Sequence, residues 1–202
     1  MSIRILIIAS LLLPGVAAWG EPGDNDKRFG VGLETGGLWF SRNDIRIPND
    51  TGTRYDMTDL TGSGPDFFAR IDGHWDINDK HGLRIVIAPL EVSGTGELAQ
   101  DTDFAGETFA AGTTEGTYKF NGYKLTYRYT FADKGSWRWR VGFTGFVRDA
   151  NVELRQGSLQ ANDDDVGFVP ALHVSGEYRL AENWLLRLDF DGLAGGPGRL
   201  ID

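Results

Sequence analysis

The residues of this sequence that could do covalent chemistry lie together in one short segment. His173, Ser175 and Glu177 alternate with apolar or small residues, so in an extended chain their side chains project from one face. An imidazole base, a hydroxyl nucleophile and a carboxylate that orients the base are the groups that acyl transfer requires. Same-face neighbours along a strand lie about 6.6 Å apart, so spacing alone does not bring them into contact. We therefore favour hydrogen bonding inside a polar interior over catalysis, with hydrolysis as an alternative.

Acidic residues form a second group with possible chemistry. No Lys or Arg lies between Arg84 and Lys119, a stretch rich in Asp and Glu. Carboxylate oxygens at this density could hold Ca²⁺ or Mg²⁺. The spacing of an EF-hand is absent, so we expect no dedicated metal site and no cofactor, only acidic loops that attract divalent cations. The candidate ligands are Asp101, Asp103, Asp163, Asp164 and Asp165.

The composition excludes several classes of protein. The chain has 202 residues, of which 41% are hydrophobic and 24% charged, which is enough for one folded domain. A formal net charge of −9 argues against a nucleic-acid partner, because phosphate binding needs clustered Lys and Arg. The absence of Cys excludes a disulfide scaffold and thiolate metal sites.

The first segment has the pattern of an export signal. Residues 1–18 combine one basic residue, Arg4, with a short apolar run and the small-residue end Val16-Ala17-Ala18, which predicts cleavage after Ala18. The run is about half the roughly 20 apolar residues that a membrane helix needs. A polar leader, 19–28, would follow, and 29–202 would form the folded domain.

The rest of the chain alternates between apolar and polar residues. Trp137, Val141 and Phe143 share one face of a predicted strand whose other face carries Arg138 and Arg140. This period of two recurs along the chain, whereas helical periodicity is almost absent. We expect seven strands, at 29–40, 65–78, 81–98, 116–131, 136–148, 166–180 and 184–192.

The connections between these strands alternate in length. Long Gly-, Asp- and Thr-rich loops are expected at 41–64, 99–115 and 156–165, and tight turns at 78–80, 132–135 and 181–183. An antiparallel meander with its long loops at one end and its turns at the other is the pattern of an up-and-down transmembrane β-barrel.

The two faces of the predicted strands fit a membrane environment. Aromatic residues fall near both strand ends, where amphipathic rings prefer the headgroup level of a bilayer. The opposite face would line the lumen with charges of both signs, which we expect to pair and plug the barrel. The expected aromatic bands include Trp39, Trp75, Trp137, Trp139 and Trp184, and the expected lumen network includes Glu34, Arg70, Asp72, Arg140, Glu177, Arg187 and Asp189.

These features together resemble the small outer-membrane β-barrel proteins of Gram-negative bacteria, the broad group that contains the outer-membrane protein A and protein W barrels. The resemblance implies residence in the outer membrane, and contact with lipid, lipopolysaccharide and the barrel assembly machinery. The pair His173 and Ser175 separately resembles the His-x-Ser pair of outer-membrane lipid A deacylases.

The resemblance also predicts a closing strand beyond the last residues. Bacterial single-chain barrels have even strand numbers, whereas seven strands and the stub Arg199-Leu200-Ile201-Asp202 cannot close. We expect a C-terminally truncated sequence of a barrel with 8 to 10 strands. The leading function is a structural or interaction protein with acidic extracellular loops. The alternatives are a narrow pore and an outer-membrane hydrolase.

Overall fold

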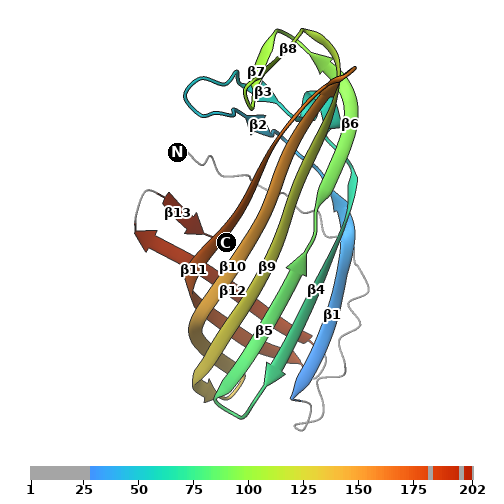
Figure 1. Ribbon diagram of the computed structural model, residues 1–202. Helices are drawn as coiled ribbons and strands as arrows, with labels where there is room; N and C mark the ends of the chain where they lie inside the picture. Colours follow the sequence, from blue (N-terminus) through green and yellow to red (C-terminus); the bar gives the residue numbers. More distant parts are fainter. Residues whose placement is uncertain (1–27, 182–183, 196–197, 202) are drawn as a thin grey trace.

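The computed structural model describes residues 28–181, 184–195 and 198–201. The predicted signal segment, 1–18, and all but the last residue of the predicted leader lie outside these residues. The described part is an all-β, curled antiparallel sheet (Figure 1). Within it, no helix is long and apolar enough to cross a bilayer.

Each of the seven predicted strands is present, and neighbours in sequence are neighbours in the sheet. The order β1-β4-β5-β9-β10-β11-β12-β13 is an antiparallel meander, and β6 continues the path of β5 along β9. Pro89 lies between β5 and β6. Because it belongs to neither strand, its lack of a backbone N–H removes no hydrogen bond between strands. The strands are β1 (Phe29–Leu38), β4 (Asp66–Asp76), β5 (His81–Ala88), β6 (Glu91–Leu98), β9 (Gly112–Lys134), β10 (Trp137–Gln156), β11 (Leu159–Ala181), β12 (Trp184–Gly195) and β13 (Gly198–Ile201).

The curl of the sheet is strong enough to bring distant strands face to face. Strands β5 and β12 are separated in the sheet by β9, β10 and β11, yet Arg84 Nη1 of β5 lies 3.1 Å from Asp189 Oδ1 of β12. Figure 1 shows β12 passing behind the front strands. The sheet therefore encloses an interior as a half-barrel. We call the end at which residues 77–80 and 135–136 connect the strands the turn end, and the opposite end the cap end.

The two faces of the sheet have opposite polarity. Leu188 and Phe143 on the outer face are 62% and 65% exposed, whereas Arg128 and His173 on the inner face are each 1% exposed. Each strand alternates between the two environments, as its period of two requires. The polar side chains therefore form the packed interior, and the large apolar side chains form the outer surface.

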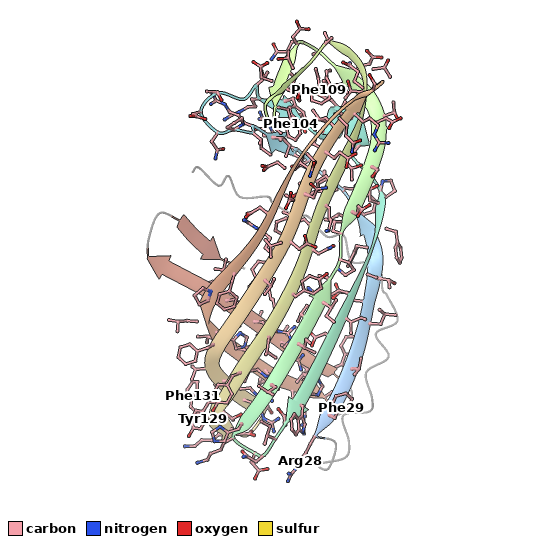
Figure 2. The ribbon with its side chains drawn as sticks, viewed as in Figure 1. Arg28, Phe29, Phe104, Phe109, Tyr129 and Phe131 are labelled. Atoms are coloured by element: carbon pink, nitrogen blue, oxygen red, sulfur yellow. The ribbon has the colours of Figure 1, made fainter. Side chains whose placement is uncertain are left out.

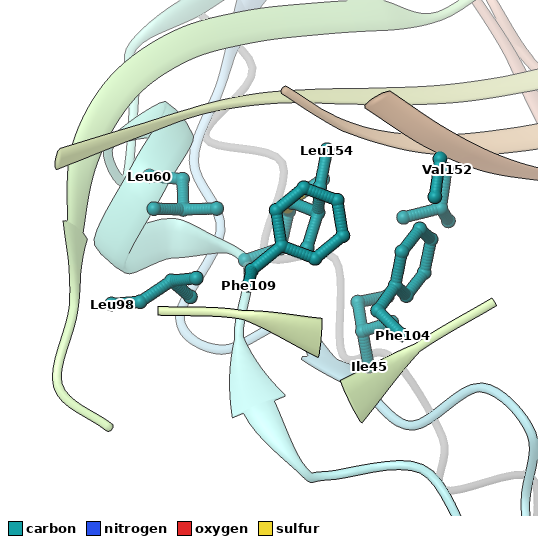
Figure 3. Close-up of a cluster of buried hydrophobic side chains, with 9 residues drawn as sticks. Ile45, Leu60, Leu98, Phe104, Phe109, Val152 and Leu154 are labelled. Atoms are coloured by element: carbon teal, nitrogen blue, oxygen red, sulfur yellow. The ribbon is translucent and has the colours of Figure 1, made fainter. Parts of the chain in front are cut away.

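Two of the predicted loops fold into a compact cap. Residues 41–64 contain β2 (Asp44–Ile45), β3 (Tyr55–Asp56) and the short helix α1 (Thr58–Thr61), and 99–115 contain the hairpin of β7 (Thr102–Phe104) and β8 (Glu107–Phe109). Their apolar side chains pack on the inner face of the extended ends of β6, β9, β10 and β11 (Figure 3). The buried core of the cap consists of Ile45, Met57, Leu60, Leu98, Phe104, Phe109, Val152, Leu154 and Ala161.

The prediction of a third long loop, at 156–165, is wrong. Strand β10 extends to Gln156 and β11 starts at Leu159, so only two residues connect them. Gly157 has φ of +60°, a value that glycine adopts at low cost and that permits this tight turn. The strands continue because Leu154 and Ala161 of their inner face join the core of the cap. Figure 2 shows Phe104 and Phe109 at this cap end, and Phe29, Tyr129 and Phe131 at the turn end.

Candidate functional site: the polar interior

The best-connected group of interior side chains surrounds Asp191 of β12. His173 Nδ1 lies 2.7 Å from Asp191 Oδ1, and Thr144 Oγ1 donates a hydrogen bond of 2.7 Å to the same oxygen. Because Thr144 donates its hydroxyl proton to Asp191, Thr126 must be the donor in the 2.8 Å bond between the two threonines. Lys124 Nζ lies 3.5 Å from Asp191 Oδ2. Residues from β9, β10, β11 and β12 are thereby joined.

A second group crosses the interior from β4 to β12. Arg84 donates from Nε to Asp72 Oδ2 at 2.9 Å, and its Nη1 lies 3.1 Å from Asp189 Oδ1. One guanidinium therefore connects two carboxylates from strands on opposite sides of the interior. A separate pair, Arg70 with Glu34, joins β4 to β1 nearer the cap.

A third group lies toward the turn end, around Glu177. Arg140 Nη1 and Arg187 Nη2 lie 2.8 and 2.9 Å from the same oxygen, Glu177 Oε1. Asp76 lies farther away, 3.8 Å from Arg140 Nη2 and 3.6 Å from Arg128 Nη2. The seven charges expected in the lumen network thus fall into the Arg84 group, the Arg70–Glu34 pair and the Glu177 group. The Asp191 group contains none of the seven.

The structure does not assemble the sequence-derived set His173, Ser175 and Glu177 into a catalytic triad. All three are buried on the inner face of β11, but Glu177 binds two arginines and the carboxylate beside His173 is Asp191. Ser175 Oγ and His173 Nε2 are both buried without a hydrogen-bond partner, so they do not bond to each other. His173 Nε2 instead lies 3.8 Å from Asp189 Oδ1. The imidazole therefore lies between two aspartates, with its hydrogen bond to Asp191 and none to Ser175.

The candidate metal ligands are spread over separate elements. Asp101 Oδ1 accepts a hydrogen bond from the Ala111 N–H, and Asp103 Oδ1 accepts one from Thr108 Oγ1. Asp163, Asp164 and Asp165 lie within β11 and not in a loop, because β10 and β11 continue to the turn at Gly157. In the described part of the chain, no group of three or more His, Asp or Glu side chains is arranged to hold a metal ion.

The tryptophans of the expected aromatic bands lie on the outer face near the strand ends. Trp75, Trp137, Trp139 and Trp184 belong to the turn-end segments of β4, β10 and β12, and are between 37% and 71% exposed. Trp137 and Trp139 stack with ring centroids 5.4 Å apart, and Trp137 also lies 4.6 Å from Tyr178. Trp39, which is 40% exposed, follows β1 at its cap end.

The cap has its own polar contacts, which sequence reasoning did not identify. Burial raises the pKa of Asp56, but hydrogen bonds from the Asn43 N–H and from Thr58 lower it more, so the net pKa lies below the ordinary value. Burial raises the pKa of Tyr55. These groups were missed because their partners come from a segment with no strand or helix periodicity.

Thr126 and Thr144 are interior partners that the expected lumen network of charged residues did not include. Both occupy positions in phase with the charged inner face, so the period of two could have identified them. No protein-family model matches this sequence, and no curated protein matches it. The functional assignment therefore rests on the geometry of the two faces and the polar interior.

Proposed function

We propose that this protein is a β-barrel of the bacterial outer membrane with a structural or interaction role. The observation that carries the proposal is the inverted polarity of the sheet, with apolar side chains outward and ion pairs inward. In water, an outer surface of exposed Leu, Phe, Val and Trp side chains would drive aggregation. Against acyl chains the same surface is stabilised, and the charges inside are shielded from lipid.

The positions of the aromatic side chains support a bilayer-spanning orientation. Exposed Trp and Tyr side chains occur at the turn end, including Trp137, Trp139 and Trp184, while Trp39 and Phe67 lie toward the cap end. Aromatic side chains prefer the interface between headgroups and acyl chains. In this proposal the turns face the periplasm, the cap faces the medium, and residues 1–18 direct export.

The partners follow from these surfaces. The outer face would contact lipid and lipopolysaccharide, and insertion would require the barrel assembly machinery. Acidic side chains of the cap, such as Asp50, Asp59 and Glu107, are exposed and would attract divalent cations at the anionic cell surface. No nucleic-acid partner is proposed for so acidic a chain.

A sealed interior is favoured over a pore. The Arg84–Asp189 pair spans the enclosed space, and Arg140 and Glu177 are both under 10% exposed. Separating such buried partners would leave uncompensated charges, which is strongly unfavourable. A hydrolase is not favoured, because His173 faces Asp189 and Asp191 while Ser175 has no base within hydrogen-bond distance.

The test is expression of the chain in a Gram-negative host, followed by fractionation and by electrophoresis of heated and unheated samples. We expect recovery in the outer membrane and a heat-dependent shift in mobility, because a folded barrel resists detergent until it is heated. Recovery as a soluble periplasmic protein without detergent would refute the membrane proposal. In planar bilayers a sealed barrel gives no steady current, whereas a steady current would favour the pore.

A further inference from the structure

Arg128 of β9 is a fully buried cation that the ion-pair groups leave incompletely bonded. Its side chain is 1% exposed, and its Nε and Nη2 atoms are buried without a hydrogen-bond acceptor. Its neighbours on the same rung of the sheet are Gly82 of β5 and Gly142 of β10. A Cβ atom at Gly82 would lie 2.6 Å from Asp76 Oδ1, so this glycine leaves room for one carboxylate on that side of Arg128, and Asp76 occupies it.

The two unbonded nitrogens are the pair that binds oxyanions best. Nε and Nη2 lie on one edge of the guanidinium, and their parallel N–H groups match the two oxygens of a carboxylate or two oxygens of a phosphate. The closest carboxylate, Asp76, lies 3.6 Å from Nη2 of Arg128 and 3.8 Å from Nη2 of Arg140. Asp76 is therefore too distant to satisfy either guanidinium by a direct hydrogen bond.

The neighbouring cations do not compete for this edge. Arg140 Nη1 and Arg187 Nη2 lie 2.8 and 2.9 Å from Glu177 Oε1, whereas the ion pair of Arg128 is with Asp76 at 3.6 Å. An anion with two acceptor oxygens would supply the two hydrogen bonds that Nε and Nη2 of Arg128 lack.

We propose that the interior binds a small oxyanion, a carboxylate or a phosphate, on the Nε–Nη2 edge of Arg128. Access is from the turn end, where Asp76 is the last residue of β4 and its side chain is 31% exposed. The anion takes the position beside Arg128 as the Asp76 carboxylate turns toward solvent. The proposal concerns the interior alone, and it stands whether or not the outer face contacts lipid.

The test is calorimetric titration of the full 202-residue chain, folded in an uncharged detergent, with inorganic phosphate and separately with acetate. A chloride salt is added to keep the ionic strength the same in every titration. We expect saturable binding of at least one anion, and the stronger of the two identifies the phosphate or the carboxylate class. Arg128→Lys keeps the charge but loses the paired N–H groups, so we expect its affinity to fall about tenfold or more.

Two further variants make the test decisive. Asp76→Asn removes the competing carboxylate and should bind the anion more tightly than the wild type. Arg138→Lys changes an exposed arginine at the same end, which pairs with Asp133 at 2.8 Å, and should bind as the wild type does. The proposal is overturned if neither the wild type nor Asp76→Asn shows saturable binding, or if Arg128→Lys and Arg138→Lys bind alike. Asp76→Asn keeps the test valid if Arg128→Lys does not fold.

Discussion

Substitution of Gly96 by Ala should weaken the packing of the cap helix on the sheet. Gly96 lies on the inner face of β6, directly under α1. A Cβ atom at this position would lie 2.0 Å from the Asp59 carbonyl oxygen and 2.8 Å from Leu60 Cα. Both are backbone atoms, so no side-chain rotation relieves the overlap, and α1 must move by more than 1 Å.

The size of the effect follows from what α1 buries. Met57 and Leu60 are 0% and 2% exposed and pack beside Phe109 in the core of the cap. Overpacking of a well-packed core costs about 1–3 kcal/mol. When the cap opens and closes faster than the protease cleaves, the cleavage rate is proportional to the fraction of molecules with an open cap. A cost of about 1–3 kcal/mol raises that fraction, and therefore the cleavage rate, by roughly 5- to 150-fold.

The assay is limited trypsin digestion, with cleavage at Arg46 and Arg54 followed by mass spectrometry. The matched control is Thr95→Ala, which changes the neighbouring residue on the outer face of the same strand, where the side chain is exposed. We expect faster cleavage at both sites in Gly96→Ala and unchanged cleavage in the control. Equal rates in Gly96→Ala and the wild type would refute the close packing of α1 on β6.

Three other predictions test the outer face, the interior and the cap. Leu188→Arg places a charge on the outer face and should destabilise the protein in lipid bilayers by about 2–4 kcal/mol, measured by urea unfolding in vesicles; no change would contradict contact with lipid. Asp191→Ala leaves His173 and Lys124 without their shared carboxylate and should lower the free energy of unfolding by about 3 kcal/mol, whereas a loss below 1 kcal/mol would show that the pairing is not stabilising. The folded-state pKa of Asp56 is lowered, so its contribution to cap stability is present above the ordinary aspartate pKa of about 4 and is lost as the pH falls through the folded-state value. Hydrogen exchange of residues 55–61, corrected for the intrinsic pH dependence, should show this loss in the wild type and not in Asp56→Asn.

The strands and their two faces were predictable because the information is local. Successive side chains of a strand point to opposite sides, so the alternation of Trp137, Val141 and Phe143 with arginines places each residue on a face without reference to the rest of the chain. Short polar segments predicted tight turns at 78–80 and 132–135, and the structure has connections at 77–80 and 135–136, because β9 extends to Lys134. The same periodicity failed at 156–165, where a run of aspartates has loop composition but lies in an extended strand.

The cap was not predictable from periodicity. Segments 41–64 and 99–115 are rich in Gly, Asp and Thr, yet they contribute Met57, Leu60, Phe104 and Phe109 to a buried core. These side chains are scattered singly in the sequence, so no short window shows an apolar pattern. They become a core only because the extended ends of β6, β9 and β10 present an apolar inner face on which they pack.

The sequence by itself determined an antiparallel meander with an apolar side and a charged side, since both depend on neighbours within one strand. Only the tertiary structure decided which charges meet. Arg84 pairs with Asp189, and His173 with Asp191 instead of Glu177, because the curl of the sheet and the register between strands set these distances. Alternation along a strand carries no information about the strand on the far side of the interior, and for that reason the partners of the inner side chains could not be read from the sequence.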